Sequence, residues 1–421
     1  MKKLFITFLL ACCLSIQSTA QSFDTTPSIG NGMNISANGF AKWEGYRYPI
    51  DFVIVDGKVT ITQYKANYSS FSIYPTIGGF PVTDIGSLAF YNSSLTNIVI
   101  PNNITDIRVQ AFRSCILATS VTIGNSVTNI EGGAFYTCTA LTNITIPLNV
   151  IYLGEDVFFG CGSLKNVIIG NNVEKINNNA FQQCQKLKNV IIGNSVTDIN
   201  GYAFHNDISL TNIIFGSSVT NIGERAFQQN YKLLYLTLPS NLKIIGNFAF
   251  YNCTNIQNLV IPDSVISLGD AAFNSCKSLT NIIIGSGITV LNPEVFDSCQ
   301  KLQNIDIPNI ITSIGYGAFN NCYAVTNITI GTSVNSIDYN AFSSCTNLAR
   351  INIPVNVTSI GSGAFRYCSK LYGIYFYGNA PTDGGNIFLS NTNIVYIVEG
   401  TTGWPTPPDP WSGRPTAYWT P

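Results

Sequence analysis

The chain has 421 residues, of which 46% are hydrophobic and 10% are charged, and its formal net charge is −1. This length and this hydrophobic content are enough for a large buried core, and they exclude a disordered chain. Because the net charge offers no basic field to hold phosphate backbones, we expect no nucleic-acid partner.

Residues 1–20 have the pattern of a secretory signal peptide. Two lysines precede the apolar run LFITFLLACCL, and small residues precede a cleavage after Ala20. This run is too short to span a bilayer as a mature helix, and no later apolar run is long enough, so we expect no transmembrane segment. The string LLAC also resembles a lipoprotein cleavage box, which leaves a lipid anchor at Cys12 as an open alternative. Both routes lead to a secreted or cell-surface bacterial protein.

Residues 21–76 precede the regular part of the sequence. The stretch FVIVDGKVTIT, from Phe52 to Thr62, alternates apolar and polar residues on both sides of an Asp-Gly pair. Alternation around Asp-Gly predicts a β-hairpin with a tight turn. We expect these residues to form an N-terminal cap on the first repeat, because the open end of a repeat array has to be shielded.

Residues 77–388 contain a repeat with a period of 23. The pattern is A-F-x-x-C-x-x-L-x-N-I-x-I-[PG]-x-x-V-x-x-I-G, and every interval between its phenylalanines is 23 residues except the first, which is 22. The phenylalanines of the regular units are Phe90, Phe112, Phe135, Phe158, Phe181, Phe204, Phe227, Phe250, Phe273, Phe296, Phe319, Phe342 and Phe365, and Phe388 continues the spacing.

Each part of the repeat predicts a local structure. The segment N-I-x-I predicts a short strand, and V-x-x-I predicts a second extended piece. The position held by Gly154, Asn177, Asn200 and Gly223 favours residues that tolerate φ > 0, so we expect a sharp turn there. The segment A-F-x-x-C is then expected to form a short helical or 3₁₀ turn.

A single unit of this size cannot bury its own Leu, Ile and Phe side chains, whereas stacked units can. The repeat therefore predicts a β-rich solenoid of about 13 coils. At about 4.8 Å per coil the array would be about 60 Å long. Blocks such as CTALTNITIPLNVIYLGEDVF resemble the BspA-type leucine-rich repeats of bacterial surface proteins. The resemblance implies a secreted or surface-attached protein, and in some members adhesion to host proteins, matrix proteins or other cells.

Ten cysteines of the repeats occupy one position, three residues after the phenylalanine, where Asp207 and Asn230 replace it in two units. No two of these cysteines are close enough in sequence for a zinc motif, and ten equivalent thiols are not ten nucleophiles. We expect a ladder of buried free thiols that act as small apolar fillers. Occasional disulfides between adjacent coils remain an alternative, because stacked Cα atoms lie within the permitted range.

The candidate binding residues are on the predicted long strand. A recurring Asn is interpreted as a structural ladder of hydrogen bonds between coils. The variable position between the two strand isoleucines is free of the core, and it holds apolar residues in the middle of the array and polar or aromatic residues toward its C-terminal end. Large apolar and aromatic side chains dominate contact energies. The candidate ligand-binding residues are Leu234, Tyr235, Tyr372, Tyr375, Ile168, Ile191 and Ile214.

Residues 389–421 lie outside the repeat and are rich in Pro and Trp, so we expect an ordered C-terminal cap. No catalytic, cofactor-binding or metal-binding set stands out, and His205 is interpreted as a surface residue of a turn. We therefore expect no enzyme and no cofactor, but a secreted or surface scaffold that binds an extracellular protein or glycan. A purely structural envelope protein is the alternative, and an enzyme is a more distant one.

Overall fold

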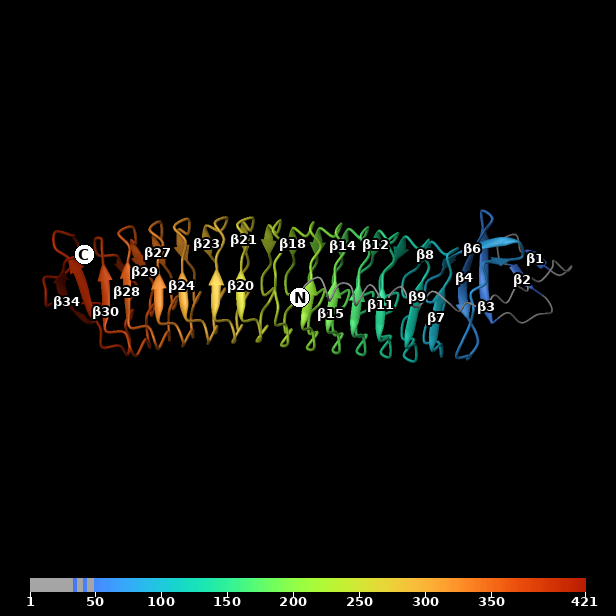
Figure 1. The fold of residues 1–421 in the computed structure, drawn as a ribbon, viewed down its shortest axis with the longest axis horizontal. Helices are drawn as coiled ribbons and strands as arrows, with labels where there is room; N and C mark the ends of the chain where they lie inside the picture. The colour runs from blue at the N-terminus through green and yellow to red at the C-terminus, as the bar shows by residue number, and fades with distance from the viewer. Residues whose placement is uncertain (1–32, 36–40, 44–48) are drawn as a thin grey trace, which may run out of the picture.

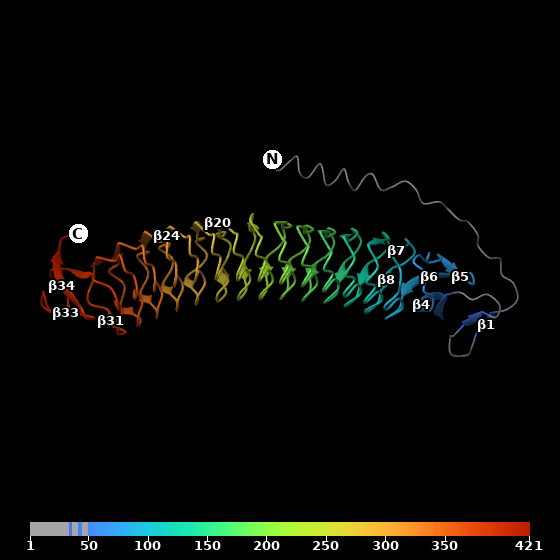
Figure 2. The same ribbon diagram turned by 90° about the horizontal axis from the view of Figure 1, so that it is seen from below.

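The computed structural model describes residues 33–35, 41–43 and 49–421, and the repeats form a long, gently arched rod of stacked coils (Figure 1, Figure 2). The predicted repeat solenoid is confirmed. The chain makes about 16 turns rather than 13, because strands outside the phenylalanine repeats continue the stack at both ends. The predicted signal peptide at 1–20, with Cys12, lies outside the described residues. In the described ranges, no helix has the length and apolar character to cross a membrane.

One side of the rod is a ladder of long strands that pair in parallel and in register. Asn166 pairs with Asn189, and Ile168 pairs with Ile191. Alternation sends the first Ile of each N-I-x-I segment into the core and leaves the Asn and the variable residue outside. The strands are β7 (Asn97–Ile100), β9 (Ser120–Ile123), β11 (Asn143–Thr145), β13 (Asn166–Ile168), β15 (Asn189–Ile191), β17 (Asn212–Ile214), β20 (Asn258–Val260), β22 (Asn281–Ile283), β24 (Asn304–Asp306), β26 (Asn327–Thr329), β28 (Arg350–Ile353), β30 (Gly373–Phe376), β32 (Ile394–Val398) and β34 (Arg414–Trp419).

A second side is a parallel ladder of short strands formed by the V-x-x-I segments. The last residue of nearly every short strand is a buried Ile or Leu. The strands are β6 (Phe80–Ile85), β8 (Asp106–Ile107), β10 (Asn129–Ile130), β12 (Tyr152–Leu153), β14 (Lys175–Ile176), β16 (Asp198–Ile199), β18 (Asn221–Ile222), β19 (Ile244–Ile245), β21 (Ser267–Leu268), β23 (Val290–Leu291), β25 (Ser313–Ile314), β27 (Ser336–Ile337), β29 (Ser359–Ile360) and β31 (Thr382–Asp383).

The third side is a ribbon of linked tight turns, here called the turn ribbon, where the sequence predicted a helical or 3₁₀ turn. That prediction is wrong, and no helix occurs in the part of the chain that the structure describes. Turns close from Ala134 N to Glu131 O, from Tyr136 N to Gly133 O and from Cys138 N to Phe135 O. Gly133 and Thr137 have φ of 63° and 53°, and left-handed residues at such regular intervals prevent a right-handed helix from continuing.

The expected sharp turn at Gly154, Asn177, Asn200 and Gly223 is displaced. Positive φ occurs two residues later, for example at Asp156, where φ is 55°. A Cβ added to Gly154 would lie 2.4 Å from the nitrogen of Gly132, so this glycine permits close approach of the preceding coil. Asn177, at the same position one repeat on, donates from Nδ2 to Leu153 O of the preceding coil at 2.7 Å. The position is therefore a contact between coils and not a left-handed turn.

The core is a continuous stack of phenylalanine rings with the isoleucines and leucines around it. Ring centroids of successive repeats lie 5.3 Å apart for Phe112 and Phe135 and 5.2 Å apart for Phe181 and Phe204. The planes of both pairs are within a few degrees of parallel, which repeats of equal length allow. All the phenylalanines of the regular repeats are fully buried. The stack fixes the register of every coil, so outward positions form straight columns along the rod.

The ends of the rod close the two ladders in different ways. At the N-terminal end the predicted hairpin is present as β3 (Ile50–Val55) and β4 (Lys58–Tyr64), with a turn at Asp56 and Gly57, and β4 pairs in parallel with β6. The other strands near this end are β1 (Met33–Ile35), β2 (Ala41–Trp43) and β5 (Thr76–Ile77). At the C-terminal end β33 (Pro410–Trp411) pairs with β34. Trp404 and Trp411 pack on Phe376 with centroid distances of 4.8 and 5.5 Å.

Candidate functional site

The outward positions of the long strands form a surface that we call the strand face. Three predicted residues, Ile168, Ile191 and Ile214, lie side by side in the variable column of this face, because their strands pair in register. Ile168 and Ile191 are partly buried, and Ile214 is 41% exposed. The column continues with Val260 and Ile283, which are 54% and 62% exposed. A run of apolar side chains therefore lies on the outside of the rod, broken by one threonine.

The asparagine column of the strand face is a hydrogen-bonded ladder, as the sequence predicted. Asn166 donates from Nδ2 to Asn143 Oδ1 at 2.7 Å, and Asn189 donates to Asn166 Oδ1 at 2.8 Å. Asn281 donates to Asn258 Oδ1 at 3.1 Å. Because these amides satisfy one another, the column is a structural element on both sides of the middle of the rod.

The middle of the rod interrupts this ladder at Tyr235. This tyrosine stands in the asparagine column, and its coil has no regular long strand, only a single bridge between Asn212 and Tyr235. Its side chain is 69% exposed, while the preceding Leu234 is partly buried. A large aromatic ring thus projects from a column of small amides and lies next to the apolar run. Because Tyr235 has no amide, the hydrogen-bonded ladder is interrupted at this coil.

The two C-terminal candidates are separate from this centre. Tyr372 occupies the column of Leu234 six repeats further on, which is about 29 Å at about 4.8 Å per coil, and it is 54% exposed. Tyr375 is partly buried, because its ring stacks on Tyr396 at 4.6 Å and meets Trp419 edge-on at 5.1 Å. The structure therefore brings the isoleucines, Leu234 and Tyr235 together in the middle of the rod and leaves Tyr372 and Tyr375 beside the C-terminal cap.

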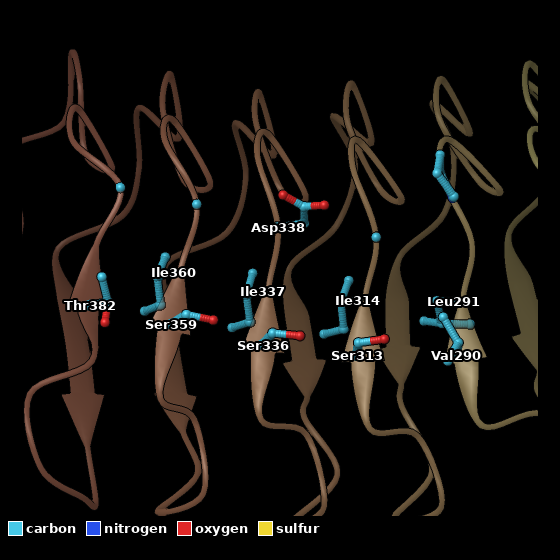
Figure 3. Close-up of a pocket in the computed structure, with 14 residues that line it drawn as sticks. Val290, Leu291, Ser313, Ile314, Ser336, Ile337, Asp338, Ser359, Ile360 and Thr382 are labelled. Atoms are coloured by element: carbon cyan, nitrogen blue, oxygen red, sulfur yellow. The ribbon is translucent and has the colours of Figure 1, made fainter.

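The short-strand side carries a groove that the sequence reasoning missed. Its volume is about 550 Å³, and Ser313, Ser336, Ser359 and Thr382 form a row of hydroxyls along it (Figure 3). The groove is hollow because Gly315, Gly361 and Gly384 leave no side chain above that row, whereas Asp338 fills the same position in one coil. Serine at the start of successive short strands was the available sequence signal. The groove is open, its row of hydroxyls is polar, and Asp338 is the only ionisable side chain among the residues that line it.

The cysteines are free and buried, and they do more than fill space. Each thiol donates to the carbonyl oxygen of the phenylalanine of the preceding coil, as Cys161 does to Phe135 O at 3.3 Å. Asn230 makes the equivalent bond from Nδ2 to Phe204 O at 2.9 Å. Burial raises the pKa of the Cys161 thiol to about 12, so this thiol is not a nucleophile at neutral pH. The position therefore selects small residues that donate a hydrogen bond.

Asp207 is the exception at the cysteine position. Its Oδ1 accepts a hydrogen bond from Cys184 N at 2.7 Å, but its Oδ2 is buried and has no partner. Burial raises the pKa of this carboxyl well above its usual range. A protonated Oδ2–H would supply the donor that the thiols supply elsewhere, with Phe181 O as the equivalent acceptor. Asp207 is therefore best understood as a neutral acid that belongs to the core.

The described residues offer little for catalysis. His205 lies on the turn ribbon and is partly buried, and desolvation and the nearby Arg225 lower its pKa. Its Nδ1 has no hydrogen-bond partner. Within the ranges that the structure covers, no group of three or more His, Cys, Asp or Glu side chains is arranged to hold a metal ion. The arrangement is suited to contact with a partner along an extended surface.

Comparison with known proteins identifies the repeat. The family described as "BspA type Leucine rich repeat region (6 copies)" matches residues 83–210, 174–303 and 289–401, which together span most of the chain. No curated protein matches the chain.

Two solved structures illustrate the similarity. A leucine-rich repeat protein from Bacteroides ovatus is 24% identical, with 85% of this chain and 95% of that chain covered and a TM-score of 0.60. A leucine rich cell surface protein from Faecalibacterium prausnitzii is 29% identical, with coverages of 80% and 95% and a TM-score of 0.47.

Proposed function

The chain belongs to the BspA-type leucine-rich repeat family, and from this membership we propose that it is a secreted or cell-surface binding scaffold of a bacterium. The proposed ligand is an extracellular protein or glycan, and the proposed role is adhesion. Support for the location comes from the signal-peptide pattern of residues 1–20, with a lipid anchor at Cys12 as the alternative mode of attachment.

The observation that carries the proposal is the exposed apolar run on the strand face with Tyr235 beside it. The repeat itself requires only that the core residues be kept, so an exposed tyrosine that breaks the asparagine ladder is not explained by packing. Exposed aromatic residues next to apolar side chains are the usual anchors of protein contacts. A partner lying along this face would bury on the order of 800 Å² of it.

The proposal assigns no enzymatic activity to the chain. Burial raises the pKa of the Cys161 and Cys253 thiols to about 12, which makes these two unsuited to nucleophilic attack. His205 has a lowered pKa, and its ring meets the ring of Tyr202 edge-on at 5.5 Å, which is a packing contact. The scaffold interpretation needs none of these groups to react.

A binding experiment on intact protein tests the proposal. The full mature chain is immobilised and offered extracellular matrix proteins and glycans, and the affinity of each ligand captured is compared between wild type and the double variant Tyr235→Ala/Tyr372→Ala. Loss of two anchors should weaken binding by at least ~2 kcal/mol, which is about 30-fold. Both side chains are more than half exposed, so the fold should survive their removal.

The matched control places a comparable set of changes on the turn ribbon. Alanine at Gln182, His205 and Gln228 should leave the affinity unchanged. If those substitutions weaken binding and the tyrosine variant binds like wild type, the site lies on the turn ribbon. If the chain captures no ligand with saturable affinity, the scaffold is structural and the proposal fails.

A further inference from the structure

The net charge of −1 conceals a separation of charge across the width of the rod. The four residues after the cysteine position lead from the turn ribbon to the long strand, and in the repeats from Cys115 to Cys368 none of them is Asp or Glu. Seven of these positions hold lysine, and we call these seven lysines the lysine edge. Its members are Lys165, Lys186, Lys188, Lys232, Lys277, Lys301 and Lys370.

All members of the lysine edge are exposed. The ion pairs found among the described residues lie elsewhere: at Arg108 and Lys175 on the short-strand side, at Arg225 on the turn ribbon and at Lys65 near the N-terminal hairpin. Most acidic residues of the repeats lie on the short strands and on the segments that lead from them into the turn ribbon, whereas Asp306 lies on the strand face and Asp297 on the turn ribbon. They include Asp106, Glu131, Glu155, Glu174, Asp198, Glu224, Asp270, Glu294 and Asp338.

The stacking of the coils forces some of these lysines together. Lys188 donates its backbone N–H to the carbonyl oxygen of Lys165 at 2.8 Å, so the two residues stand directly one above the other. Lys186 is on the same coil as Lys188. Like charges at such spacing repel one another, and no acidic residue among these positions relieves that repulsion. The fold thus maintains a row of uncompensated positive charge, which a negatively charged partner would stabilise.

We propose that the lysine edge binds a linear acidic polysaccharide that lies parallel to the axis of the rod. This inference rests on the proposed scaffold function and narrows the ligand to a glycan carrying carboxylate or sulfate groups. The seven lysines are spread over about nine repeats, which is about one positive charge per 6 Å at about 4.8 Å per coil. In a linear polysaccharide that carries one charge on every sugar ring or on every second ring, neighbouring charges lie far enough apart to pair with successive lysines of this row.

Two features of the edge favour a glycan over a nucleic acid. Duplex DNA carries about one charge per 1.7 Å, far denser than this row, and the acidic side of the rod would repel a duplex of its width. Tyr323 and Tyr372 lie among the same positions and are 39% and 54% exposed. Their rings offer flat apolar faces next to the lysines, against which the apolar faces of sugar rings can pack.

The test measures binding of the full mature chain to two probes, heparin as a sulfated polymer and polygalacturonate as a carboxylated one, with uncharged dextran as the blank. At about 50 mM salt we expect saturable binding to at least one probe, weakened at least tenfold at about 300 mM salt because the contacts are exposed ion pairs. The variant Lys165→Gln/Lys186→Gln/Lys188→Gln should weaken binding at least tenfold. The control Lys58→Gln/Lys175→Gln/Lys243→Gln makes the same change in net charge elsewhere and should alter binding less than twofold.

Several outcomes overturn the inference. They are an absence of binding to both probes at low salt, an equal loss in the control variant, and tighter binding to duplex DNA than to either glycan. Self-association of the chain in sedimentation, abolished by the lysine variant without any polymer, would show that the partner is the acidic side of a second copy. Tyr235 lies outside the positions of the lysine edge, so Tyr235→Ala alone tests the proposed function separately. A ligand that is lost with Tyr235→Ala but bound normally by the lysine variant refutes this inference alone.

Discussion

Replacement of Asp207 by Asn tests the interpretation of the buried ladder of donors. In the native chain Asp207 Oδ2 is buried without a partner, whereas Asn230, which occupies the equivalent position one repeat later, donates from Nδ2 to Phe204 O and Phe227 O, both at 2.9 Å. The amide introduced by Asp207→Asn would provide the same donor without a proton to lose. We expect this variant to keep the fold intact and to remove a pH dependence of stability.

The direction of the pKa shift of Asp207 determines whether the free energy of unfolding rises or falls with pH. Burial raises the pKa of the Asp207 carboxyl in the folded chain, while the unfolded value is about 3.9. The stabilising contribution is fully present below that unfolded value and is lost as pH rises through the folded pKa, because only the unfolded chain releases the proton in between. Between the unfolded and the folded pKa the loss is about 1.4 kcal/mol for each pH unit.

The assay is urea denaturation followed by circular dichroism at pH 5 and pH 7. The wild-type chain should lose this free energy of unfolding relative to Asp207→Asn between the two pH values. The titratable neighbour Cys184, whose own pKa is raised by burial, is present in both proteins. Asp306→Asn removes an exposed carboxyl of the strand face and should retain the wild-type dependence. Parallel pH profiles for wild type and Asp207→Asn would refute the assignment of a neutral buried acid.

Three other predictions concern packing, the ladder and processing. Cys184→Ala removes a buried sulfur and its hydrogen bond to Phe158 O, and it should destabilise the chain by about 1–2 kcal/mol in the same assay, without loss of a bound metal. Stoichiometric zinc in the native protein by mass spectrometry, or most thiols found in disulfides, would contradict this prediction. Tyr235→Asn restores an amide between Asn212 and Asn258, so it should raise the free energy of unfolding by about 0.5–1 kcal/mol and weaken ligand binding. A clear loss of stability would show instead that the tyrosine is a packing residue. Intact mass of the exported protein should correspond to an N-terminus at Gln21, and an acylated Cys12 would establish the lipoprotein alternative instead.

The core could be predicted in detail because its causes are local and repeated. The spacing of the phenylalanines alone placed Phe135 over Phe112, and the N-I-x-I alternation placed Ile168 beside Ile191 on the outside of a parallel ladder. The hairpin at Asp56 and Gly57 followed from its turn residues.

Other features depend on contacts between coils that no single repeat reveals. The turn ribbon was predicted as helical because A-F-x-x-C has no glycine to mark its left-handed residues, and residues such as Tyr202 and Gln183 adopt φ of 58° and 62° there. The donor role of the cysteines requires the carbonyl of the preceding coil, which the sequence does not place. The groove arises from glycines at one position of several nearby coils, Gly315 and Gly361 among them.

The sequence predicted which residues belong to the candidate site better than it predicted where those residues lie. Variability at the strand position pointed to the isoleucine column, and a tyrosine in place of the recurring Asn pointed to Tyr235. The structure leaves both outside the core. The partial burial of Tyr375 came from Tyr396 and Trp419, which belong to a C-terminal segment outside the repeat, so repeat periodicity contained no information about that contact.

Hydroxyl-radical footprinting of the chain with and without its captured ligand tests the strand-face proposal most directly, because it reports the exposure of individual side chains. Tyr235 is 69% exposed in the free chain and should be protected in the complex, together with Ile283 of the apolar run. Tyr152 and Ile266, on the short-strand side and 48% and 66% exposed, should react equally in both states. Protection of Tyr152 and Ile266 with Tyr235 unchanged would contradict the account and place the ligand on the opposite side of the rod.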